Sequence, residues 1–126
     1  MPIKLFNRTI GLIQKSLDIR TFRHKLLSEN IANSATPNFQ SKDISFQKML
    51  ARSIDQPSSL SLRRTHIGHL PGGLEGGGEV ETAAGGFNIE EEMAKLAENN
   101  LMYQAGIQAL SKKLEGLKVT ISEGGR

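Results

Sequence analysis

The chain has no cysteine and no tryptophan, and aromatic residues make up only 5% of its 126 positions. Without cysteine it can form neither disulfides nor thiolate metal sites, and nothing about the redox compartment follows from that. Only 37% of the residues are hydrophobic, so a compact core for this length would be thin. The length allows one domain at most.

Long apolar runs are missing as well, so no transmembrane helix is expected. The N-terminus, MPIKLFNRTIGLIQK, lacks an uninterrupted apolar core and a small-residue cleavage site, which argues against a Sec-type signal peptide. Lys4, Arg8 and Lys15 precede the first acidic residue, as in organelle transit sequences, but the amphipathic pattern continues far beyond them. We therefore interpret this end as the start of a helix.

Charge is unevenly distributed along the chain. Residues 1–66 hold eleven Lys/Arg and four Asp/Glu, a balance of +7, whereas residues 67–126 hold five and nine, a balance of −4. Opposite signs favour pairing of the two halves, within one chain or between chains. A nucleic-acid-binding protein usually keeps its positive charge concentrated and unopposed.

The strongest periodic pattern lies at the C-terminal end and predicts a helix over about 89–122. Asn88 is a plausible N-cap, Glu90, Glu91 and Glu92 suit the positive end of the helix dipole, and Gly124 ends the pattern. Ten positions alternate spacings of four and three, which is a heptad pattern, and Asn100 among them could fix register. This C-terminal seam comprises Ile89, Met93, Leu96, Asn100, Tyr103, Ile107, Leu110, Leu114, Leu117 and Ile121.

The N-terminal end repeats the pattern and predicts a helix over about 3–33. One apolar stripe consists of Ile3, Phe6, Ile10, Ile13 and Leu17, and a second consists of Leu5, Leu12, Ile19 and Leu26. Pairing the two terminal helices would leave much of the second stripe exposed. Burying a single stripe also does not reliably offset the entropy lost on ordering a helix of this length. We therefore expect neighbouring chains to complete the packing.

The middle of the chain has a different character. Residues 34–54 contain a turn and an apolar pattern that permits a short helix near 44–54, with Asp43 as a possible cap. Residues 55–87 form a Gly-rich segment, since eight of the thirteen glycines fall between Gly68 and Gly86. The expected organisation is thus a rod helix in 1–33, a turn and short helix in 34–54, a flexible segment in 55–87 and a second rod helix in 88–126. The fold class is mainly α, with a coiled-coil-like pair of terminal helices around an irregular middle.

Candidate chemical sites are weak. His66 and His69 are three residues apart but have no third ligand nearby, and Gly68 and Pro71 indicate a loop. The stretch GGLEGGG lacks the Gly-Lys-Ser/Thr end of a phosphate-binding loop. No serine, histidine and acid group as a nucleophilic set. We expect no enzymatic activity, no catalytic residue, no metal and no cofactor.

Residues 28–39, SENIANSATPNF, have the features of a rigid joint at the end of the first helix. Asn33 tolerates the left-handed conformation of a C-terminal cap, and Asn30 could bond carbonyls left free there. Pro37 and Asn38 suit the centre of a type II turn, where the second residue needs a positive φ, and Phe39 would anchor the turn.

The same residues resemble the N-terminal signature of flagellar axial rod and hook proteins, in which Asn-Ile-Ala-Asn precedes Thr-Pro-Gly-Tyr or a near variant. The run EEEMAKLAENNLMYQAGIQALSKKLEGLK resembles the closing helix of that family, and KDISFQKML and RRTHIGHLPG are similar to segments of its short basal-body members. Asn38 and Phe39 replace the usual glycine and tyrosine. The matching motif residues are Asn30, Ile31, Ala32, Asn33, Thr36 and Pro37.

The resemblance implies a structural subunit of the flagellar proximal rod, which assembles through its terminal helices into a torque-transmitting shaft. It implies export by the flagellar type III apparatus without a cleaved signal, and a final place in the periplasmic rod of the basal body. The implied partners are other rod proteins, copies of the chain and proteins at the junction of rotor ring and export gate, with neither nucleic acid nor membrane insertion. Two alternatives stay open: a small basic helical nucleic-acid-binding protein, and a type III-exported coiled-coil adaptor.

Overall fold

The computed structural model of the chain describes residues 2–55, 80–82 and 87–124, with side chains from residue 8 onward. Within these ranges the elements are α1 (Pro2–Ala32), β1 (Lys42–Ile44), α2 (Phe46–Asp55), β2 (Val80–Thr82) and α3 (Ile89–Glu123). The class is mainly α, as the sequence predicts, and both long helices match their predicted bounds to within one residue. The side chains of Ile3, Leu5 and Phe6, together with His66, His69 and the GGLEGGG stretch, lie outside the described residues. No described helix is both long and apolar enough to span a bilayer.

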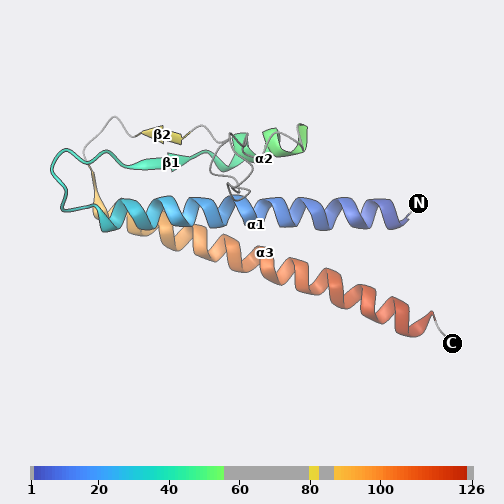
Figure 1. The fold of residues 1–126 in the computed structure, drawn as a ribbon. Coiled ribbons are helices and arrows are strands. Elements are labelled where there is room, and N and C mark those ends of the chain that lie inside the picture. The colour runs from blue at the N-terminus through green and yellow to red at the C-terminus, as the bar shows by residue number, and fades with distance from the viewer. Residues whose placement is uncertain (1, 56–79, 83–86, 125–126) are drawn as a thin grey trace, which may run out of the picture.

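The two long helices run antiparallel (Figure 1). They lie together where α1 ends and α3 begins, and they diverge toward the N- and C-termini, which lie at the same end of the pair. The predicted coiled-coil-like pair is therefore present, but its closest packing is confined to one end. The diverging arms carry long apolar faces that the partner helix does not fully cover.

The hydrophobic core lies on the other side of α1, beneath α2 and β1. Its buried members are Ile19 and Leu26 from α1, Ile44 from β1 and Met49 from α2. Helix pairing alone is expected to leave much of the second apolar stripe for neighbouring chains to cover, but Ile19 and Leu26 are covered by β1 and α2 of the same chain. The middle of the chain folds back over them, which a pairing of the terminal helices alone does not anticipate.

A two-stranded antiparallel sheet, not predicted from the sequence, completes this layer. β1 pairs with β2 so that Asp43 lies opposite Glu81 and Ile44 opposite Val80. The ammonium group of Lys48 on α2 contacts the carboxylate of Glu81 at 2.6 Å. Strands of three residues are too short to show an alternating pattern, so only long-range pairing reveals them.

Local hydrogen bonds fix the ends of the helices. Asn88 caps α3 as predicted, with its side-chain oxygen accepting from the backbone N–H of Glu90 at 3.0 Å. The predicted cap of α2, Asp43, is wrong: the hydroxyl of Ser45 faces the N–H of Lys48 at 3.5 Å, and the Ser45 carbonyl accepts from Met49. Asp43 is instead engaged by Arg23, as described below.

The joint after α1 has the predicted turn. The N–H of Phe39 donates to the carbonyl of Thr36 at 3.2 Å, and Asn38 has a φ of 58°, the positive value expected for the second central residue of a type II turn. The ring of Phe39 packs edge-on against Phe87, with 6.0 Å between centroids. Because Phe87 immediately precedes the N-cap of α3, this contact ties the joint to the start of the last helix.

Candidate assembly interface

The line along which α3 approaches α1 most closely consists of residues seven apart: Glu92, Asn99 and Gly106. Glu92 and Asn99 are 3% and 1% exposed. A Cβ atom added to Gly106 would lie 2.8 Å from a terminal methyl of Leu17, so the two helices are close at that level as well. A carboxylate, an amide and a glycine carry no hydrophobic signal, which is why apolar periodicity did not locate this line.

Asn30 is the centre of the polar contact at the joint. It is 1% exposed, and its amide nitrogen donates to the carboxylate of Glu92 at 2.7 Å and to the carbonyl of Lys42 at 2.8 Å. Its side-chain oxygen accepts from the N–H of Lys42 at 3.0 Å. One side chain thus connects the end of α1, the start of β1 and the first turn of α3. Lys95 completes the cluster, with its ammonium group 3.0 Å from Glu92.

The two asparagines of the joint have different roles from those predicted. Asn33, not Asn30, bonds a carbonyl at the end of α1: its amide donates to Glu29 at 2.8 Å. Among described non-glycine residues only Asn38 has a positive φ, so Asn33 is not a left-handed cap. Asn30 is buried because it lies in the last turn of α1, between β1 and α3. Asn33 follows the end of the helix and is exposed.

Asn99 forms the second polar contact between the long helices. Its amide nitrogen donates to the backbone carbonyl of Arg20 at 2.9 Å. Because a carbonyl can only accept, this bond fixes the orientation of the amide and leaves the side-chain oxygen without a partner among the described residues. A shallow groove beside it is lined by Arg20, Thr21, His24 and Tyr103, among others.

Two arginines of α1 connect the helix to the middle layer. Arg23 forms two parallel hydrogen bonds to the carboxylate of Asp43, at 2.8 and 2.7 Å, and these bonds raise the pKa of Arg23. The guanidinium of Arg20 lies 4.2 Å from the ring centroid of Phe46, and burial lowers the pKa of Arg20, with the charge of Arg23 adding to the effect. Both groups are cations at neutral pH, so part of the basic charge of the N-terminal half is used inside the fold.

The residues of the predicted C-terminal seam fall into two sets. Leu96, Tyr103, Leu110 and Leu117 are half-buried along the side of α3 that faces α1, and Ile89 of the same register is exposed at the start of the helix. The other set is exposed, and its apolar members form what we call the exposed row. The exposed row consists of Met93, Ile107, Leu114 and Ile121, and Asn100 occupies the same register between the first two.

In α1, the described part of the first predicted stripe, Ile10, Ile13 and Leu17, is half-buried. Leu12 of the second stripe is exposed. The apolar faces of both long helices are therefore only partly covered where the two helices diverge.

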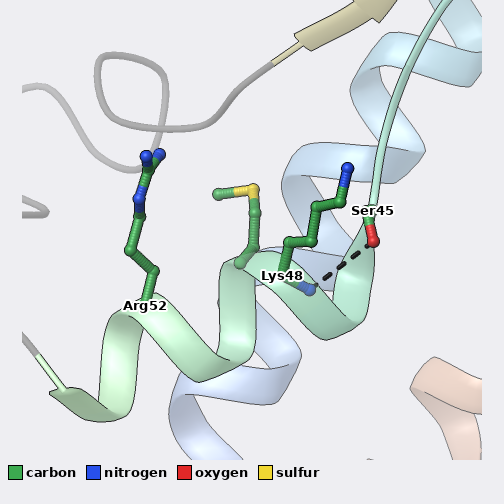
Figure 2. A pocket seen from close by; sticks show the side chains of 4 residues that line it. Ser45, Lys48 and Arg52 are labelled. Atoms are coloured by element: carbon green, nitrogen blue, oxygen red, sulfur yellow. Dashed lines mark hydrogen bonds between the residues drawn. The ribbon is translucent and has the colours of Figure 1, made fainter.

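A shallow pocket on α2 is lined by Ser45, Lys48, Met49 and Arg52 (Figure 2). Figure 2 shows the long side chains of Lys48 and Arg52 on one side of the helix. Lys48 is paired with Glu81, so the pocket is bounded by an ion pair that joins α2 to β2.

Comparison with known proteins decides the family. No family model matches the chain. The flagellar basal body rod protein FlgB of Bacillus subtilis is 30% identical over 97% of this chain and 99% of its own length. The chain belongs to the FlgB family of flagellar basal body rod proteins. FlgB of Cereibacter sphaeroides is 34% identical over 92% of the chain, and FlgB of Escherichia coli K12 is 28% identical over 88%.

Membership of the FlgB family confirms the resemblance drawn from the two terminal segments, and it extends that resemblance through the middle of the chain. It makes the chain a structural protein of the flagellar basal body rod, associated with other rod components. The comparisons give no support to a nucleic-acid-binding protein or an exported adaptor. In this FlgB-family member the motif residues Asn30, Thr36, Asn38 and Phe39 all lie at the joint that connects α1 to β1 and α3.

Sequence reasoning missed the three residues of the line along which α3 packs against α1. The sequence predicts Glu92 as one of three acids at the helix start, and of those three it is the one turned inward. The heptad pattern includes Asn100, which is exposed, and omits its buried neighbour Asn99. The signal that could have found them is the seven-residue spacing of Glu92, Asn99 and Gly106, which is the spacing of one line along a helix that packs against another.

Proposed function

We propose that this chain is a non-enzymatic building block of the proximal rod, and that it self-assembles through its terminal helices into the torque-transmitting shaft. The observation that carries the proposal is the exposed row on α3, an apolar line that the chain's own α1 leaves uncovered. Water-exposed leucine and isoleucine at heptad spacing on a long helix favour packing against another helix. Neighbouring subunits would supply that helix.

The proposed neighbours are copies of the same chain, other rod proteins and the proteins at the junction of rotor ring and export gate. The proposed route is the flagellar type III apparatus, without a cleaved signal, to the periplasmic rod. Family membership supports the location, and the uncovered helix faces support the mode of assembly.

The first test is complementation of a strain that lacks its own FlgB. Expression of this chain is expected to restore swimming in soft agar and intact basal bodies in purified preparations. A chain without residues 107–126, which removes most of the exposed row, is expected to restore neither. Recovery of motility with the truncated chain would contradict assembly through the terminal helices.

Circular dichroism of the purified monomer provides a second test. Because the described residues cover the apolar faces of the diverging arms only in part, we expect a helix content well below the full length of α1 and α3, rising when the chain polymerises. The measurement compares dilute monomer with assembled material at one temperature. A fully helical monomer with a sharp thermal transition would show that the arms need no neighbours.

A further inference from the structure

We propose that Asn30 and Glu92 are positioning residues for assembly: their buried contact sets the register and rotation of α3 against α1, and so determines where the exposed row points. The contact joins the last turn of α1 to the first turn of α3 at 2.7 Å, with both side chains nearly inaccessible to solvent. Its consequence for assembly rests on the proposed function, whereas the contact itself does not.

The apolar pattern alone cannot set this register. The seam of α3 repeats every seven residues, so sliding the helix by seven would present a similar set of leucines and isoleucines to α1. Apolar contacts are non-directional and distinguish poorly between such positions. A buried polar residue at one position can distinguish them, because in the wrong register it loses its partner.

Slipping α3 by seven residues would place Asn99 opposite Asn30 in place of Glu92. The amide of Asn30 would then face a second amide, and the carboxylate of Glu92 would lose the only buried partner it has outside its own helix among the described residues. Leaving buried polar groups unpaired is unfavourable. The hydrogen bonds of Asn30 to both backbone groups of Lys42 hold the asparagine itself in place, so it acts as a fixed reference point.

The same contact sets the rotation of α3. Successive residues of a helix are about 100° apart around its axis. Turning Glu92 toward α1 therefore turns Met93 away, and Met93 is 58% exposed. The rest of the exposed row follows at intervals of seven and lies on the same side of the helix.

The experiment measures the α1–α3 distance in the full chain by spin labelling at Ser28→Cys and Ala94→Cys. Both positions are exposed, and the chain has no other cysteine. We expect a single narrow distance distribution. Asn30→Asp places two carboxylates face to face and is expected to broaden the distribution at least twofold. Adding Glu92→Gln restores a donor opposite the new carboxylate and is expected to bring back most of the narrow population.

The matched control is Asn33→Asp, the same change in the same motif at a side chain whose hydrogen bond, among the described residues, stays within the end of α1. It is expected to leave the distribution unchanged. The proposal would be overturned if Asn30→Asp and Asn33→Asp broadened the distance distribution equally, or if the double variant did not narrow it again. The double variant keeps the test valid even if Asn30→Asp by itself unfolds the chain. In the complementation assay the double variant should swim better than Asn30→Asp. Failure of the unmodified chain in that assay would count against the proposed function and leave the distance result intact.

Discussion

Substitution of Leu114 by aspartate is expected to abolish rod assembly while leaving the isolated chain as stable as before. Leu114 is 48% exposed in the middle of the exposed row, so within the single chain the carboxylate stays in water. In an assembled rod the same position would be covered by a neighbouring helix, and burial of an unpaired carboxylate costs several kcal/mol or more. Each subunit would carry this penalty, so the effect on a polymer is cumulative.

The measurement for Leu114→Asp is soft-agar motility together with electron microscopy of purified basal bodies. Gln108→Asp is the control, because Gln108 is exposed on the same helix about 100° from Ile107 and outside the exposed row. It is expected to support motility. Normal motility of Leu114→Asp would mean that the exposed row stays exposed in the rod.

Replacement of Ile19 by alanine is expected to lower the free energy of unfolding of the monomer by about 2–5 kcal/mol. Ile19 is fully buried in the cluster with Leu26, Ile44 and Met49, so the truncation leaves a cavity between α1, β1 and α2. Small domains are stable by only about 5–15 kcal/mol, and a loss of this size would leave a considerable unfolded fraction. Ile19→Val, which removes one methyl group, should cost about 0.5–1.5 kcal/mol.

Urea denaturation followed by circular dichroism measures these differences. Leu101→Ala is the control, since Leu101 is 66% exposed and its truncation should change stability by no more than about 0.5 kcal/mol. If Ile19→Ala matched the control, the layer of α2 and β1 over α1 would contribute little to stability. The two expected results differ in kind, because Ile19 acts within one chain and Leu114 between chains.

The long helices were predictable because their signals are local and repeated. Apolar side chains at alternating spacings of three and four over some thirty residues are compatible with little besides a helix, and Asn88 marks the start of α3 by its own hydrogen bond. The turn at residues 36–39 was predictable for a similar reason, since Pro37 and Asn38 restrict their own backbone angles.

The strands and the partners of Asn30 were not predictable in the same way. β1 and β2 each have three residues and are separated by thirty-five positions, so their pairing depends on how the chain folds back over α1. The side-chain amide of Asn30 could donate to a carbonyl at the end of α1 or to a group on another element. It donates to Lys42 and Glu92 because β1 and α3 lie beside it in the fold. Polar residues in a helix interface carry no hydrophobic signal that indicates which way they face.

By itself, the sequence determined two long amphipathic helices, one toward each end of the chain, and a conformationally restricted turn after the first of them. It did so because helix periodicity and turn geometry are properties of neighbouring residues. Only the tertiary structure decided which side of α3 meets α1, that Glu92 and Asn99 lie inside, and that the exposed row remains outside. Those choices depend on directional contacts between residues about sixty to eighty positions apart, and the apolar pattern of the two helices does not encode them.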